Sequence, residues 1–419
     1  MTRITTPHAK PPYLTQPLAP AHDLATLDGP ERFARAIERA RRIMLGAPWF
    51  LRNENRPLER AAAERQLKHN ISAALDQGFI LHDPLFPEFR LSDRHNQFGL
   101  FNPDNRYHLA SISAPGRYVV RGRRGTSADL QIQVGSGVFK LETVSQMSSE
   151  ELVTDDEGNF EIVISDTCEG DNWLAIADGE RGATTVLIRE SFMDWERETA
   201  GTWTIERTDT WGTPRPLVTP DLVSGQYARA AQHLTTSTAG WVAFVGKLLG
   251  ELEPNTLSEP AESASGGLTG QFNVKGVFPA HADTATVISV PRSRARYQSI
   301  QVGDLWFNSL DYTRRQTSLT AAQARPSSDG LLHMVVSRRD PGVANWLDPA
   351  GASTVFAFLR WQGLPGRRFR KAHRPTVRVV PFDELRAHLP HDEPHVGPEA
   401  RAEQLAARQA AALRSPRGF

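Results

Sequence analysis

The chain has 419 residues, 39% of them hydrophobic and 23% charged, which is typical of a globular protein with two or three domains. Lys plus Arg and Asp plus Glu number 48 each, so no net field attracts nucleic acid or an anionic membrane, and we expect neither as a partner. The single cysteine, Cys168, excludes an internal disulfide and a cysteine metal cluster.

The first 90 residues predict an irregular arm followed by two helices. Residues 1–27 are polar and rich in Pro and Thr, without the apolar segment of a signal peptide. Asp28 can cap a helix that Gly46 ends, and a second helix is expected over 57–77. The chain has no run of 18 apolar residues, so we expect no membrane span and a cytoplasmic protein.

Residues 91–215 and 271–380 predict two copies of one β-rich module. Ile132–Gly135 recurs 168 residues downstream (300 − 132) as Ile300–Gly303, and three further blocks correspond in the same order. Short apolar runs separated by Gly, Asp, Asn and Ser are typical of antiparallel sandwiches or barrels. We therefore expect a mainly β fold with α additions, in which two duplicated antiparallel β-sandwich modules are accompanied by N-terminal, inter-module and C-terminal helices.

Two further segments flank the second copy. Residues 216–270 predict a connecting helix, capped by Thr219 and interrupted at Gly240, followed by a mobile loop over 254–270. Residues 381–419 predict a helical tail, with a short helix over 381–389 and an Ala- and Arg-rich helix over 399–413. The second of these is marginal alone and should pack on the body or on a partner.

Several motifs of the second copy resemble the bacterial family called domain of unknown function 1214. They are Arg296–Val302, Asp304–Phe307, Leu310–Tyr312, Arg315–Leu319, Asp340–Gly342 and Asn345–Asp348. The first copy, with Asn102–Tyr107 and Tyr118–Gly125, is similar to the related first half of long members of that family. The resemblance implies bacterial proteins with jelly-roll-like β-sandwich domains, and it implies no established reaction.

Residues shared by both copies indicate fold rather than function. Asn172 and Asn345, each followed by Trp and Leu, predict a corner in which the Asn bonds a turn and the Trp fills the core. Arg189 and Arg360 are also shared. Such an arginine at a strand end either braces buried acceptors or binds a substrate.

Polar and aromatic residues found only in the second copy are the functional candidates. A largely apolar pocket with a few fixed polar groups suits this mixture. Asp304 or Asp311 would be the general base, with a pKa raised by burial beside Trp306, and Tyr312 the acid. The expected substrate-binding residues are Trp306, Arg314, Gln316, Gln323, Asp348 and Trp361, together with the shared Arg360. The alternative is that these residues cap turns and pair on the surface.

The histidines predict no metal site. His391 and His395 are four residues apart, but Pro394 prevents the helix that would align them. His333 lies between apolar neighbours on a predicted strand, so alternation places it on the opposite, solvated face. The sequence also lacks glycine-rich nucleotide and phosphate motifs, so we expect neither a metal nor another cofactor.

Three functions remain open. The first is an intracellular bacterial enzyme that uses cofactor-independent acid–base chemistry, as a lyase, hydratase or dehydratase, isomerase or hydrolase. Its substrate would be a mostly apolar small molecule of aromatic, terpenoid or steroid-like type. The second is a non-catalytic ligand-binding or scaffold protein, and the third is a structural homodimer whose edge strands pair.

Overall fold

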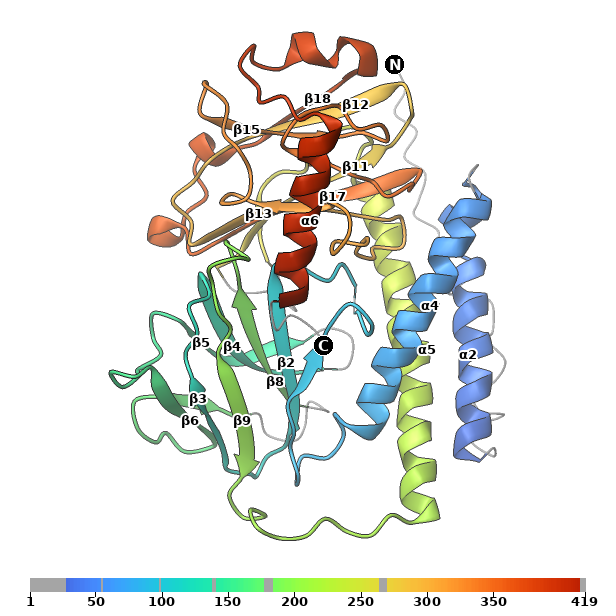
Figure 1. The fold of residues 1–419 in the computed structure, drawn as a ribbon. Helices are drawn as coiled ribbons and strands as arrows, with labels where there is room; N and C mark the ends of the chain where they lie inside the picture. Colours follow the sequence, from blue (N-terminus) through green and yellow to red (C-terminus); the bar gives the residue numbers. More distant parts are fainter. Residues whose placement is uncertain are drawn as a thin grey trace, which may run out of the picture.

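The computed structural model describes residues 28–53, 56–97, 99–137, 141–176, 184–263 and 270–414, so the expected arm over 1–27 lies outside the described residues. Two β-sandwich modules lie one above the other, and a layer of long helices runs along one side of both (Figure 1).

Three helices make that layer, and a short fourth helix joins the first two. They are α2 (Gly29–Leu45), α3 (Pro48–Leu51), α4 (Arg56–Phe79) and α5 (Pro220–Glu251). The predicted caps are confirmed, because Asp28 accepts a hydrogen bond from the Glu31 amide and Thr219 from the Leu222 amide. The predicted interruption at Gly240 is wrong, since α5 is continuous through it. An internal glycine costs a helix only about 1 kcal/mol, and packing against α2 and α4 offsets that cost.

The first module consists of a five-stranded and a four-stranded sheet. The larger sheet has the order β1 (Arg90–Ser92), β2 (Asn105–Ile112), β8 (Thr184–Ser191), β4 (Asp129–Ser136), β5 (Glu142–Ser148). The smaller sheet has the order β7 (Trp173–Ala175), β6 (Asn159–Ser165), β3 (Tyr118–Arg123), β9 (Thr202–Arg207). Every pairing is antiparallel except that of β6 with β7.

The second module repeats this arrangement strand for strand. Its larger sheet has the order β10 (Ala261–Glu262), β11 (Phe272–Pro279), β17 (Thr354–Gln362), β13 (Tyr297–Gly303), β14 (Ser318–Thr320). Its smaller sheet has the order β16 (Trp346–Leu347), β15 (Leu331–Val336), β12 (Thr284–Pro291), β18 (Thr376–Pro381). The pairing of β15 with β16 is again parallel. The predicted duplication of antiparallel sandwiches is therefore confirmed.

The expected mobile loop over 254–270 contains the edge strand β10, and its residues 264–269 lie outside the described part of the chain.

The two modules differ most in one loop. The connection between β4 and β5 spans residues 137–141, whereas the equivalent connection between β13 and β14 spans 304–317. This longer segment, called here the 304–317 loop, contains six of the ten predicted site residues. Their lack of counterparts in the first copy therefore has a simple structural origin.

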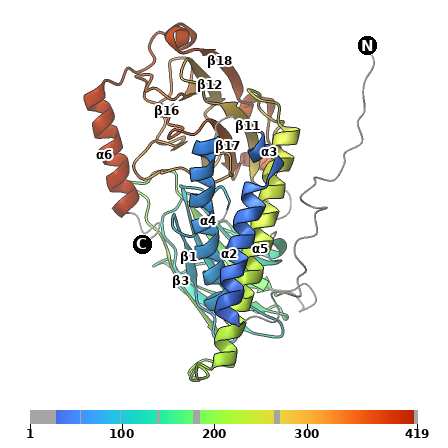
Figure 2. The same cartoon turned by 90° about the vertical axis from the view of Figure 1, so that its right-hand side faces the viewer.

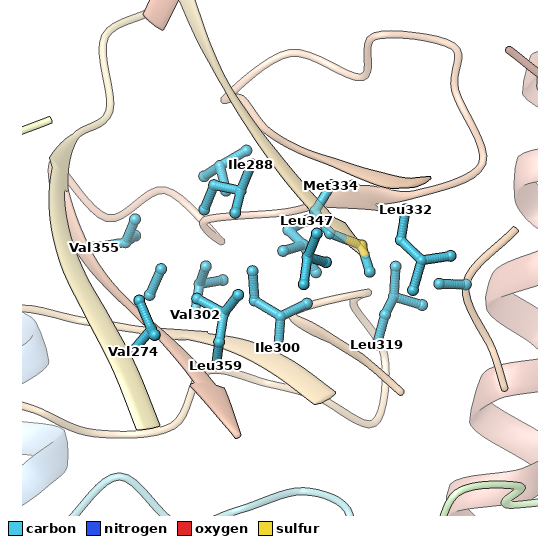
Figure 3. Packing of buried hydrophobic residues seen from close by; sticks show 14 of the residues in the cluster. Val274, Ile288, Ile300, Val302, Leu319, Leu332, Met334, Leu347, Val355 and Leu359 are labelled. Carbon is cyan, nitrogen blue, oxygen red and sulfur yellow. The ribbon is translucent and has the colours of Figure 1, made fainter. Parts of the chain in front are cut away.

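Each sandwich has its own apolar core between its two sheets. In the second module, alternate residues of β13, β15 and β17 point inward, as Ile300, Met334 and Leu359 do (Figure 3). In the first module, Ile132, Ile162 and Ile188 are similarly buried. This alternation produces the apolar runs in the sequence.

The tail crosses both modules. The predicted short helix is a 3₁₀ helix, η5 (Phe382–His388), and the predicted terminal helix is α6 (Pro398–Arg414). Helix α6 lies on a different face of the molecule from the helical layer (Figures 1 and 2). Two further 3₁₀ turns precede β18, η3 (Pro365–Arg367) and η4 (Lys371–His373).

The expectation that His333 is solvated is wrong. Its side chain is buried and lies 2.7 Å from Ser289 Oγ and 2.9 Å from Asp329 Oδ2. Alternation does place His333 on the outer face of β15, but the segment after β18 covers this face, with Leu385 and Leu389 packed against Val335. Within the described residues, no helix is both long enough and apolar enough to span a membrane.

Candidate functional site

Asp304 begins the 304–317 loop and lies under helix α4. Its side chain is only 3% exposed. Oδ1 accepts hydrogen bonds from the amides of Trp306 (3.0 Å) and Asn308 (3.1 Å), and Oδ2 lies 3.4 Å from Asn308 Nδ2. Burial raises the pKa of Asp304 to about 7, although Arg65 and these hydrogen bonds oppose the shift. The predicted upward shift for this carboxyl group therefore has a geometric basis.

Three side chains of α4 lie near the start of the 304–317 loop or act on Asp304 through their charge. Glu59 accepts a hydrogen bond from Ser353 Oγ at 2.6 Å, and desolvation raises its pKa. Its charge also raises the pKa of Asp304. Arg65 donates to the Ser309 carbonyl at 2.8 Å. His69 Nδ1 lies 3.3 Å from Asn308 Oδ1, and burial lowers the pKa of His69 to about 4, so the imidazole is neutral at pH 7. We call Asp304, Glu59, Arg65 and His69 the acid centre.

An aromatic wall borders the acid centre. Trp306 is buried, donates its indole N–H to the Glu59 carbonyl at 2.8 Å, and packs against Trp49 and Phe50, with ring centroids 4.6 and 5.4 Å away. The predicted residue Trp306 thus joins the second module to the helical layer. It also gives the acid centre the low-dielectric surroundings that raise carboxyl pKa values.

Asp311 and Tyr312 lie elsewhere, at the contact between the two modules. Tyr312 packs in an aromatic cluster with Phe101 and Trp195 of the first module. Asp311 accepts hydrogen bonds from Thr313 Oγ1 (2.7 Å) and the Arg314 amide (3.3 Å), so it caps a turn. The Arg314 side chain is exposed. Of the three predicted catalytic residues, only Asp304 belongs to the acid centre.

The same contact contains a buried polar network that joins the modules. The Tyr297 hydroxyl donates to Asp104 Oδ2 at 2.7 Å, and the Trp195 indole N–H donates to Asp104 Oδ1 at 3.0 Å. Asn102 Nδ2 donates to the Tyr297 oxygen at 2.8 Å. Desolvation and the neighbouring Asp104 raise the pKa of Tyr297 well above its ordinary value, so the phenol stays protonated and acts as a donor.

Three predicted binding residues brace loops. Gln316 donates to the carbonyls of Ala344 (3.0 Å) and Trp346 (2.6 Å). Asp348 pairs with Arg315 at 2.7 Å and accepts from the Ala350 amide. Gln323 accepts from the Thr320 amide at 3.0 Å. These contacts agree with the alternative interpretation, in which such residues support turns.

Arg360 and Trp361 point to opposite faces of β17. Arg360 donates to Gln301 Oε1 at 2.8 Å, and Arg189 makes the same contact with Gln133 Oε1 at 3.3 Å in the first module. Because both copies keep this pair, its role is structural, as a brace between neighbouring strands. Trp361 is fully buried in the core of the second module.

The shared Asn residues have the predicted turn role. Asn172 bonds both backbone groups of Val153, and Asn345 bonds both backbone groups of Arg325. The Trp that follows each Asn is half-buried rather than part of the core. Its indole N–H instead bonds a serine at the end of β6 or just after β15, as with Trp346 and the Ser337 carbonyl.

Sequence reasoning missed Glu59, Arg65 and His69, although one signal was present. Helix α4 carries Glu59, Gln66, His69 and Asn70 among its buried residues. Polar residues at helical spacing beside Leu67 and Ala74 indicate a face that packs against polar partners. The sequence contains no sign that this partner is the 304–317 loop.

A separate surface groove of about 250 Å³ lies at the edge of the first module. It is lined by the segments 85–87, 205–207 and 210–213 and by Arg215. Trp211, on its rim, is 71% exposed. The two arginines of the groove are already paired, Arg207 with Asp209 and Arg215 with Glu88.

Comparison with known proteins supports the fold but indicates no activity. No protein-family model matches the chain, and no curated protein matches it. An uncharacterised protein from Burkholderia cenocepacia is similar at 28% identity and a TM-score of 0.76, over 87% of this chain and 100% of that one.

Two weaker similarities concern other solved structures. A Vibrio parahaemolyticus protein has 12% identity and a TM-score of 0.45, over 74% of this chain and 100% of that one. A salicylate 1,2-dioxygenase from Pseudaminobacter salicylatoxidans has 9% identity and a TM-score of 0.20, over 73% and 85%. Neither of these two reaches a TM-score of 0.5, so neither supports an argument, whereas the Burkholderia protein supports the fold and indicates no reaction.

Proposed function

We propose that this protein is an enzyme that uses acid–base chemistry without a cofactor, with Asp304 as the group that accepts and returns a proton. One observation carries the proposal, namely a fully buried carboxyl group whose pKa is raised to about 7. Near that pH both protonation states are populated, which is the condition for efficient general acid–base catalysis. The reaction class is a lyase, hydratase or dehydratase, isomerase or hydrolase.

In this proposal Glu59, rather than Tyr312, acts as the acid that donates a proton. Both carboxyl groups are buried, and a negative charge on Glu59 disfavours ionisation of Asp304, so the protonation of Asp304 depends on that of Glu59. Neutral His69 and cationic Arg65 supply a hydrogen-bonding group and a compensating charge. Tyr312 packs instead in the aromatic cluster between the modules.

The substrate class follows from the aromatic wall. Trp49, Phe50 and Trp306 provide an apolar surface next to the acid centre, so the substrate is a mostly apolar small molecule with one group that can lose or gain a proton. The short helix α3 carries two of these rings.

The test begins with the whole protein. A thermal-shift screen against hydroxylated aromatics, terpenoids, steroids and acidic metabolites identifies ligands, and mass spectrometry of each incubation detects turnover. Asp304→Asn should then lower the turnover rate by about two to four powers of ten. Asp311→Asn, which alters a turn cap outside the acid centre, should retain most of the activity. Full activity of Asp304→Asn would contradict the assignment of Asp304 as the group that transfers the proton.

The groove around Trp211 favours a second candidate, a non-catalytic ligand-binding protein. An exposed indole beside a cavity of about 250 Å³ suits stacking of an aromatic ligand. Turnover distinguishes the two functions, because a binder shows saturable stabilisation without product. Trp211→Ala should abolish that stabilisation if the groove is the site, and it should leave an activity of the acid centre unchanged.

A further inference from the structure

Helix α6 is fastened to the body by polar side chains. One face of the helix contributes its buried residues, Arg401, Arg408 and Ala411, together with the half-buried Gln404. The opposite face of α6 is exposed, at residues 402, 403, 406, 407, 410 and 413. The helix therefore lies as a single layer on the surface of the modules. The apolar surface that holds the helix is small, and the two arginines supply most of its specific contacts.

The guanidinium group of Arg408 occupies a polar site between the modules. Its Nε donates to the carbonyls of Tyr312 (2.8 Å) and Arg315 (3.1 Å). Its Nη1 and Nη2 donate to the carbonyl (3.0 Å) and hydroxyl (2.8 Å) of Ser318. Every acceptor comes from the second module, and none from α6 itself. The site, called here the Arg408 site, thus matches the planar fork of a guanidinium group.

The first module supplies the other wall of the Arg408 site. The guanidinium carbon lies 4.5 Å from the ring centroid of Trp195, a cation–π distance. Asp104, hydrogen-bonded to that indole, attracts the guanidinium electrostatically. An aromatic face, a carboxylate and four oxygen acceptors at a contact between domains make up the usual elements of an organic-cation site.

The other buried arginine of α6 is held differently. Arg401 pairs with Asp340, whose side chain is 36% exposed, and lies over Trp346 at 5.0 Å. It lies in the first turn of α6, whereas Arg408 lies near the C-terminal end, where helices fray most readily. Arg401 and Gln404 thus fasten the first turns of α6, and Arg408 fastens its later turns through a separate set of contacts.

We propose that the Arg408 site binds small molecules that carry a guanidinium group, and that the last two turns of α6 are its built-in occupant and lift away when such a molecule binds. The tail is tethered, so it competes with an effective concentration in the millimolar range. A free ligand therefore binds wild-type protein weakly, and it binds tightly only when Arg408 is removed.

Hydrogen exchange of the full-length wild-type protein tests the displacement. Agmatine is the probe, and 1,4-diaminobutane, which has an ammonium group in place of the guanidinium group, is the matched control. Millimolar agmatine should speed exchange of the amides of residues 408–414 in a saturable manner, and 1,4-diaminobutane should not. Unchanged protection of these amides at saturating agmatine would overturn the proposal.

Binding to variants tests the site itself. Arg408→Ala should bind agmatine at least about tenfold more tightly than wild type, because the tethered competitor is gone. Arg378→Ala, which removes an exposed arginine on β18, should bind as wild type does. If Arg408→Ala does not fold, Arg408→Lys replaces it, since lysine keeps the stem and charge but lacks the fork. Failure of the folded variant to bind agmatine, or binding equal to wild type, contradicts the proposal.

Discussion

At the scale of single residues, the raised pKa of Asp304 determines how the stability of the protein depends on pH. Its folded-state pKa lies near 7, above that of the same group in the unfolded chain. Between about pH 4 and pH 7 the native state therefore holds more protons than the unfolded state, and this group's contribution to stability is lost as the pH rises. The contribution is fully present below about pH 4.

We expect Asp304→Asn to remove this dependence. The difference in free energy of unfolding between variant and wild type should change by a few kcal/mol from about pH 4 to pH 8, in favour of the variant at high pH. Chemical denaturation at several pH values measures it. Taking the difference cancels the opposite contribution of His69, whose pKa is lowered to about 4. A difference that does not vary with pH would show that Asp304 is ionised throughout.

Activity should follow the same group. Once a substrate is known, the pH dependence of kcat/KM for the free enzyme should show an apparent pKa near 7 that belongs to the coupled pair of Asp304 and Glu59. Glu59→Gln removes the neighbouring negative charge, so it should move this apparent pKa downward. An unchanged profile would dissociate Glu59 from the chemistry.

At the scale of elements, helices α4 and α5 cross at a glycine. A Cβ built on Gly78 would lie 2.5 Å from the Gln226 carbonyl oxygen and 2.8 Å from Ala230 Cβ, closer than real contacts. Gly78→Ala should therefore destabilise the protein by about 1–3 kcal/mol through overpacking. Gly250→Ala, where nothing lies within 4 Å of the added Cβ, should instead be neutral or stabilise by up to about 1 kcal/mol. Thermal unfolding of both variants measures these changes in stability.

Sequence reasoning succeeded where the signal is local. The caps at Asp28 and Thr219 and the alternation within strands depend on neighbouring residues, and the duplication is visible as repeated strings. Reasoning failed where distant segments meet. The acid centre joins Asp304 to Glu59, and no local pattern pairs these two residues. His333 shows the same limit, because alternation predicts its face of the strand but not the tail segment that covers this face.

At the scale of the whole molecule, the hydrogen bond from Tyr297 to Asp104 couples the modules. Tyr297→Phe leaves a buried carboxylate without one donor and should cost about 1–3 kcal/mol. Unfolding should also become less cooperative, because the modules share fewer contacts. Tyr118→Phe is the matched control, since the Tyr118 hydroxyl bonds only the first module and its flanking Pro84 carbonyl. Calorimetric and van't Hoff enthalpies should diverge for the first variant alone.

The unequal lengths of the two equivalent loops also bear on how the copies diverged. Extending a loop from residues 137–141 to the span of 304–317 adds only about 1 kcal/mol of closure entropy, since that cost grows with the logarithm of length. The extended loop contacts α4 through Trp306, the first module through Ser309 and the tail through Tyr312. At this small entropic cost, the longer loop of the second copy provides contacts to α4, to the first module and to the tail. The strands of both copies have kept the same pairing.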